Sequence, residues 1–173
     1  MKFSKIILPI LIALILFSCQ NEEKKEKKDW SKINNQLIDV NKYLVQEDVE
    51  RIESYIKRNE WNMTQTETGL WYEIYENGNG KQAEENDIAT MNYSVELLDG
   101  TVCYSSDSLG TMTFKIGKGN VESGIQEGIL LLKVGDKARF IIPPYLAHGL
   151  LGDDNKIPVR SIIVYNVELL SLD

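Results

Sequence analysis

The chain has 173 residues, a length that allows one domain with appended segments, and its formal net charge is −7. A nucleic-acid-binding surface would need clustered lysine and arginine, and the basic run at residues 24–28 is short and mixed with glutamate. We therefore expect no nucleic-acid partner.

The first 18 residues are typical of a secretory signal. Lys2 and Lys5 precede an apolar run at residues 6–17. Twelve helical residues rise about 18 Å, which is well short of a ~30 Å hydrocarbon core. A basic start, a short apolar stretch and a small residue form the signal pattern. Residues 16–19 (LFSC) resemble the bacterial lipobox, which implies cleavage before Cys19 and acylation of this cysteine. Residues 1–18 are thus predicted to be a lipoprotein signal peptide.

Two alternatives remain for this segment, namely an uncleaved anchor and an ordinary signal with Cys19 placed by chance. Acyl chains bury enough methylene groups to hold a protein on a bilayer. Gln20 stands where an aspartate would favour the inner membrane of some bacteria. We therefore expect a lipid-anchored protein of the bacterial cell envelope, at the outer membrane. Cys103 would then be the only free thiol, so no internal disulfide can form.

Two segments follow before the predicted domain. Residues 19–30 are predicted to be a charged tether, because the sequence QNEEKKEKKD is too polar to bury a core. Residues 31–62 are predicted to be a helical arm, with apolar stripes at helical spacing in residues 33–44 and 49–56. The acidic break between the stripes favours one broken helix or a helical hairpin. The arm could be a spacer, or a surface for dimerisation or client docking, and the oligomeric state stays open with it.

From residue 70 onward the pattern becomes extended, and residues 63–173 are predicted to form one domain. Extended segments are predicted at residues 70–75, 88–98, 101–104, 112–116, 138–142 and 161–172, with a short amphipathic helix near residues 125–132. Tight turns favour an antiparallel sheet. The sheet needs a cover on its apolar face, and the short helix is the only one expected. The fold class is therefore α+β, a half-roll of about five strands around that helix.

Several motifs in this domain resemble those of the FKBP-type peptidyl-prolyl cis-trans isomerases, in order and at family spacing. They are residues 92–100 (NYSVELLDG), 114–119 (FKIGKG), 124–128 (GIQEG), 133–136 (KVGD), 142–149 (IPPYLAHG), 157–158 (IP) and 164–170 (VYNVELL). The resemblance covers residues 68–173 and implies the FKBP-like antiparallel half-roll. Together with the arm and the lipobox, this domain resembles the gliding-motility-associated isomerase lipoproteins of Bacteroidetes.

The resemblance implies a reaction without bond breakage. A prolyl peptide bond must rotate over a barrier of ~18–20 kcal/mol. The twisted amide has lost its resonance and is less charge-separated, so a dry apolar cleft favours it over the planar form. Such a site needs aromatic and branched walls and a few hydrogen-bond donors. We expect proline-containing polypeptides as clients and no cofactor or metal.

By motif position, the resemblance assigns catalytic roles to four residues: Tyr93, Tyr104, His148 and Tyr165. It assigns substrate contacts to six more: Cys103, Met112, Val121, Glu122, Ile125 and Ile157. Val121 and Glu122 occupy the place where the family offers a backbone N–H to the substrate carbonyl.

Five of these positions depart from the family pattern. Cys103 and Tyr104 replace a Phe-Asp pair, Met112 replaces an aromatic wall residue, Ile125 replaces a tryptophan floor, and His148 replaces a tyrosine. The changes should widen the cleft and weaken its preorganisation, so we expect reduced isomerase activity.

Simpler interpretations remain open at several positions. Tyr93 and Tyr165 could be core aromatics, and Ile125 is best explained as core. His148 has no cysteine or carboxylate cluster at ligand spacing, which argues against a metal site. Three functions therefore stay open: a tethered isomerase, a non-catalytic chaperone or assembly factor of a motility or secretion machine, and a structural lipoprotein.

Overall fold

The computed structural model describes residues 30–118 and 121–173 of the chain. The predicted signal peptide, the lipidation site Cys19 and the predicted tether up to residue 29 lie outside the described residues. Within the described part of the chain, no helix combines the length and the apolar character needed to cross a bilayer. The signal and the lipid anchor therefore stay predictions.

The helical arm is one continuous helix, α2, which spans Trp30–Asn59. The predicted break or hairpin at residues 46–48 is wrong. The helix contains no glycine or proline, and these are the residues that interrupt helices most strongly. Asp48 is buried inside the helix and bonded to Arg160 (2.7 Å), instead of starting a second helix. Lys57 and Arg58 lie in the last turn, where positive charge is favourable.

The chain divides into two compact units, residues 1–40 and residues 41–173. In the first unit, the described residues are the helical ones, and Leu37 and Val40 of the first predicted stripe are 63% and 55% exposed. In the second unit, Ile52 of the second stripe is 1% exposed. Only the second stripe is therefore a core stripe within its own unit.

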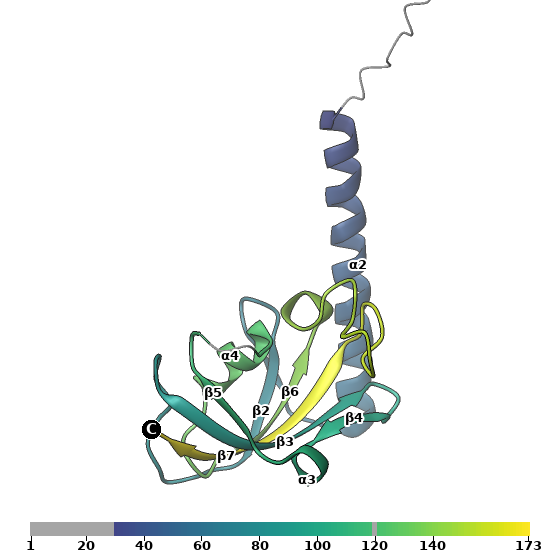
Figure 1. Ribbon diagram of the computed structural model, residues 1–173. Helices are drawn as coiled ribbons and strands as arrows, with labels where there is room; N and C mark the ends of the chain where they lie inside the picture. Colours follow the sequence, from purple (N-terminus) through teal and green to yellow (C-terminus); the bar gives the residue numbers. More distant parts are fainter. Residues whose placement is uncertain (1–29, 119–120) are drawn as a thin grey trace, which may run out of the picture. The chain divides into compact units, whose positions relative to one another are not determined.

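One seven-stranded antiparallel sheet forms the framework of the second unit (Figure 1). Its strands are β1 (Thr64–Gln65), β2 (Trp71–Glu76), β3 (Ile88–Leu97), β4 (Val102–Ser105), β5 (Met112–Lys115), β6 (Lys137–Ile142) and β7 (Ile163–Leu172). The order is β1-β2-β6-β7-β3-β4, and β5 also pairs with β3. The predicted α+β class and antiparallel pairing are confirmed. The predicted count of about five strands is too low: each of the six predicted extended segments forms a strand, and β1, which has two residues and shows no periodicity, is the seventh.

The short helix α4 (Ser123–Ile129) lies against the concave face of the sheet, as predicted (Figure 1). Two glycines allow this close approach. A Cβ atom on Gly124 would lie 2.5 Å from Cγ2 of Ile142, and one on Gly128 would lie 2.9 Å from Cζ of Phe140. Two short helical turns that the sequence did not predict, α3 (Ser106–Leu109) and η1 (Pro144–Leu146), complete the fold.

Both faces of the central strands are covered. Phe140 and Tyr165 point to the face that α4 covers, together with Ile125 and Ile129. The alternate residues Ile141 and Val164 pack on the other face. There they contact Ile52 and its neighbours from α2 within the same unit. The expectation that the short helix is the only cover is therefore wrong, because part of the arm belongs to the core.

Candidate functional site

A cavity of about 410 Å³ opens between the sheet and the segment that precedes α4. Strands, short helical turns and loops that are far apart in the sequence all contribute to it. Its lining residues are Tyr93, Val95, Tyr104, Leu109, Met112, Val121, Glu122, Ala147, His148 and Tyr165. Aromatic and aliphatic side chains predominate, with few polar groups, which is typical of a binding pocket. We call this cavity the cleft.

The structure brings most of the predicted site residues together in the cleft. All four predicted catalytic residues line it, as do Met112, Val121 and Glu122. The other three predicted residues, Cys103, Ile125 and Ile157, are 2% exposed or less and belong to the hydrophobic core behind the lining. Their contacts with substrate stay predictions, as do the roles of the residues inside the cleft.

Three lining residues were missed by sequence reasoning, namely Val95, Leu109 and Ala147. Val95 follows Tyr93 by two residues in β3, so strand alternation could have identified it. Ala147 directly precedes His148 in the motif of residues 142–149 (IPPYLAHG). Leu109 belongs to α3, a single turn within a segment that reads as a loop, and no local signal marks it.

Two aromatic rings form the inner part of the cleft. The ring centroids of Tyr93 and Tyr165 are 6.3 Å apart with an interplanar angle of 34°, a distance within the usual range for aromatic pairs. Burial, followed by the charge of Glu122, raises the pKa of the Tyr93 hydroxyl. Burial also raises the pKa of Tyr165, with further contributions from the charge and hydrogen bond of Glu122. Both phenols therefore stay protonated and able to donate.

A carboxylate lies inside this otherwise apolar cleft. The Tyr165 hydroxyl donates to Oε1 of Glu122 at 3.0 Å. Nε2 of His148 lies 2.8 Å from the same oxygen, close enough for an ion pair but outside hydrogen-bond alignment. The side chain of Glu122 is only 12% exposed. The Glu122 carboxylate therefore links two walls of the cleft, β7 and the loop after η1.

The rim of the cleft at Tyr104 is anchored to a neighbouring loop. The Tyr104 hydroxyl donates a short hydrogen bond to Asp153, and Asn155 donates to the same hydroxyl at 3.1 Å. Backbone N–H groups of Asn155 and Ile157 also donate to Asp153. Burial raises the pKa of this carboxyl, but the three hydrogen bonds outweigh burial and lower it to about 2. The hydroxyl of Tyr104 is thus already hydrogen-bonded to two residues of the loop, Asp153 and Asn155.

Cys103 stabilises the same loop from below the lining. Its thiol donates to the backbone carbonyl of Lys156 at 3.5 Å. Burial raises the pKa of this thiol. A buried thiol that stays protonated is a poor nucleophile, which fits a structural position.

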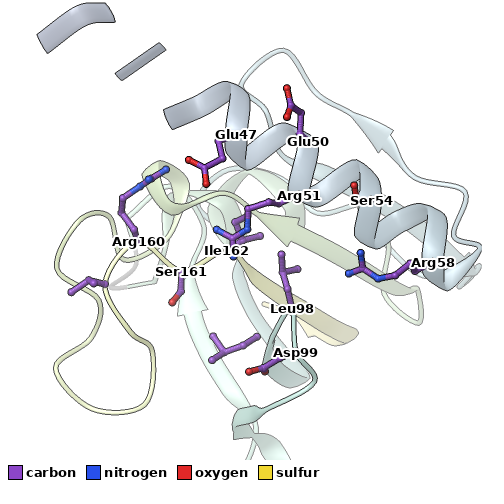
Figure 2. Close-up of a pocket in the computed structure, with 12 residues that line it drawn as sticks. Glu47, Glu50, Arg51, Ser54, Arg58, Leu98, Asp99, Arg160, Ser161 and Ile162 are labelled. Carbon is purple, nitrogen blue, oxygen red and sulfur yellow. The ribbon is translucent and has the colours of Figure 1, made fainter. Parts of the chain in front are cut away.

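A larger hollow of about 750 Å³ lies elsewhere on the second unit, between α2, the end of β3 and residues 159–162. Figure 2 shows Arg51 and Arg58 reaching into it from α2, with Leu98 and Asp99 opposite. Charges of both signs line this hollow, and none of the described residues around it is aromatic. An apolar ring would find no stacking partner there. The smaller cleft is therefore the candidate site.

Comparisons with known proteins agree with this choice. The family model described as FKBP-type peptidyl-prolyl cis-trans isomerase matches residues 79–170, which contain every lining residue of the cleft. A "Probable FKBP-type peptidyl-prolyl cis-trans isomerase FkpA" of Neisseria meningitidis is 37% identical over 126 residues, which are 71% of this chain and 46% of that protein. The FkpA of Aeromonas hydrophila is 32% identical over 156 residues, which are 88% of this chain and 52% of that protein.

A solved structure shows the same arrangement of elements. The crystal structure of AtFKBP13 is similar with a TM-score of 0.62 and 28% sequence identity. It covers 65% of this chain and 99% of its own. By contrast, the chain spans about half the length of the two FkpA proteins. The sequence matches of 126 and 156 residues are longer than the 92 residues that the family model matches, whereas the solved structure covers 65% of the chain.

Proposed function

This chain belongs to the family of FKBP-type peptidyl-prolyl cis-trans isomerases, and we propose that it catalyses prolyl isomerisation on exported polypeptides. The observation on which this proposal rests is the cleft itself. Its volume of about 410 Å³ and its aromatic and aliphatic walls suit a prolyl ring and its neighbours.

The proposed mechanism is non-covalent. Tyr93, Met112 and Tyr165 supply apolar walls that exclude water from the rotating bond. Exclusion of water favours the twisted amide, in which charge separation is lost, over the planar amide. The family position of Val121 and Glu122 predicts a backbone N–H that orients the substrate carbonyl. No step requires a nucleophile.

We propose that turnover is slower than in relatives with the Phe-Asp pair. In this chain the hydroxyl of Tyr104 is engaged by Asp153 and is not available to orient a substrate. Met112 offers a flexible side chain where the family has a rigid aromatic wall. Both features reduce the preorganisation on which such catalysis depends.

We further propose that the protein works as a lipoprotein of the bacterial cell envelope, at the outer membrane. The support is the signal pattern of residues 1–18 and the lipobox-like LFSC sequence that ends at Cys19. Its clients would then be exported proteins that contain proline. An association with gliding motility rests on the resemblance of the arm, lipobox and domain to such lipoproteins.

A second candidate is a chaperone or assembly factor that binds extended segments without turning them over. Tyr104 stands at the position of the family's acidic residue, and its hydroxyl donates to Asp153. This observation favours the second candidate, because that hydroxyl is not available to a substrate. A structural lipoprotein with an incidental cleft is the third candidate. Unchanged cellular phenotypes after substitution of Tyr93 and His148 would support that third candidate.

Catalysed refolding of a protein whose folding is limited by a proline tests the first candidate. Uncatalysed isomerisation takes tens to hundreds of seconds, so acceleration is easy to detect. We expect the full-length protein to shorten the slow phase in a concentration-dependent way, and Tyr93→Ala to lose most of this effect with its circular dichroism unchanged. Binding of the client without any acceleration would favour the second candidate.

A further inference from the structure

Glu122 is the only acidic residue among the described residues that line the cleft, and no lysine or arginine lines it. Its side chain is 12% exposed and enters a cavity with aromatic and aliphatic walls. The family position of Glu122 concerns its backbone N–H, so the role of its carboxylate is a separate matter. A charge at this position acts on any peptide that occupies the cleft.

The charge of Glu122 is only partly compensated. Its contacts are the neutral hydroxyl of Tyr165 at 3.0 Å and Nε2 of His148 at 2.8 Å. Neither contact comes from a lysine or arginine, so no permanently positive side chain among the lining residues faces this carboxylate in a region of reduced water access. At the other side of the cleft, charges of opposite sign accompany Tyr104, because Lys156 lies 5.2 Å from its ring centroid and Asp153 accepts its hydroxyl.

We propose that Glu122 makes the cleft selective for prolyl bonds flanked by lysine or arginine, and unfavourable for those flanked by aspartate or glutamate. The inference rests on the proposed function in that the cleft must receive a prolyl peptide. A client ammonium or guanidinium group supplies the positive charge that the cleft lacks, whereas a client carboxylate is repelled. Charges within a few ångströms in a partly desolvated site produce preferences of about tenfold or more.

A purely structural role of Glu122 gives a different result. If the carboxylate only orients Tyr165 and His148, its replacement changes the rate with all peptides by a similar factor. Glu122→Gln separates the two roles, because the amide oxygen still accepts a hydrogen bond from Tyr165 while the charge is gone. The ratio between peptides is thus the decisive quantity, and the absolute rate is not.

The experiment compares three peptides of sequence Ala-Xaa-Pro-Phe, capped to be neutral at both ends, with Xaa as lysine, glutamine or glutamate. Exchange NMR of the full-length protein at pH 8 measures cis-trans interconversion without a coupled protease, whose own charge preference would interfere. We expect kcat/KM to fall from the lysine to the glutamate peptide by about tenfold. In Glu122→Gln the range of kcat/KM values between the lysine and glutamate peptides should shrink to about twofold or less.

Two controls accompany the variant. Glu53→Gln makes the same change in net charge on an exposed position of α2 that does not line the cleft, and it should keep the wild-type range. Salt at 0.5 M shortens the screening length to ~4 Å and should reduce the wild-type range. A wild-type protein that treats the three peptides alike, or a Glu122→Gln variant that keeps the full range, would overturn the inference.

Absence of turnover with every peptide would refute the isomerase proposal and still leave this inference testable. The dissociation constants of the same peptides, from NMR titration, then replace the rates. Tighter binding of the lysine peptide that disappears in Glu122→Gln supports charge selection in a binding cleft. Equal affinities for the lysine and glutamate peptides in the wild-type protein refute it.

Discussion

The hydroxyl of Tyr104 donates its hydrogen bond to Asp153, a residue of the loop that follows the His148 motif. The family pattern places an acidic residue at the strand position that Tyr104 occupies here. In this protein, one acidic group belongs to the loop at Asp153, and another enters the cleft as Glu122. The polar groups around the cleft are thus rearranged rather than removed.

Replacement of Tyr104 by phenylalanine should remove the hydrogen bond to Asp153 and keep the aromatic ring that lines the cleft. Asp153 keeps its two backbone donors, so we expect a loss of about 1 kcal/mol or less in the free energy of unfolding. Urea denaturation at pH 7 measures this loss. A loss above about 3 kcal/mol would contradict the view that backbone groups anchor the loop. Ser108→Ala, a comparable loss of a surface hydroxyl beyond the loop, is the control.

The pKa of Asp153, lowered to about 2, predicts acid-dependent stability. The ordinary pKa of an aspartate is near 4, so the ionised group stabilises the folded state fully above about pH 4. This stabilisation should decline as the pH falls from about 4 to 2. Asp153→Asn should show a flatter dependence of the unfolding midpoint in that range. Parallel curves for the variant and the wild type would refute the prediction.

Gly128→Ala should destabilise the domain although alanine favours helices. The new Cβ would lie 2.9–3.1 Å from ring atoms of Phe140, which is fully buried and has no room to move. Overpacking of this kind costs about 1–3 kcal/mol, against a gain of about 1 kcal/mol in helix propensity. Thermal unfolding measures the sum. In a Phe140→Leu background the penalty of Gly128→Ala should shrink, and full additivity of the two changes would argue against a clash.

Asp136 should be among the most sensitive polar positions of the fold. It is 3% exposed, and its carboxylate accepts from the backbone N–H groups of Gly78 (2.6 Å) and Lys133 (2.7 Å). Asp136→Ala leaves both donors without this partner, and we expect a loss of about 3 kcal/mol in unfolding free energy. Asp136→Asn keeps one acceptor and should cost less. Because asparagine keeps the shape of aspartate, an Asp136→Asn variant as stable as the wild type would show that packing, and not hydrogen bonding, is responsible.

The ion pair of Asp48 and Arg160 joins α2 to the segment before β7 at 2.7 Å. Asp48 has a side chain that is 4% exposed, so Arg160→Met leaves a buried carboxylate without its main partner. We expect a loss of about 2–4 kcal/mol, below the upper range for buried pairs because Arg160 is 27% exposed. The double variant with Asp48→Leu should recover most of this loss. A double variant less stable than Arg160→Met would contradict this explanation.

Local patterns in the sequence determined six of the seven strands, the tight turns between them and the class of the fold. The alternation of buried and less buried residues in β3 and β7 involves residues that are close in sequence. Gly124 and Gly128 are four residues apart and therefore lie on one side of α4. Both features can be recognised in the sequence itself. The family motifs also located Tyr93, Tyr165 and Glu122 in one region. These features could be predicted because each depends on a short segment.

Tertiary structure alone decided how the polar groups of the site are paired and which face of the sheet Ile52 and its neighbours in the second unit cover. Glu122 and Tyr165 are 43 positions apart, and Tyr104 and Asp153 are 49 apart, so no local pattern indicates either hydrogen bond. The same holds for Ile52 of α2, which packs with Ile141 and Val164 on the far face of the sheet. Burial and side-chain hydrogen bonding depend on distances in space, and only the folded chain brings these distant residues within reach.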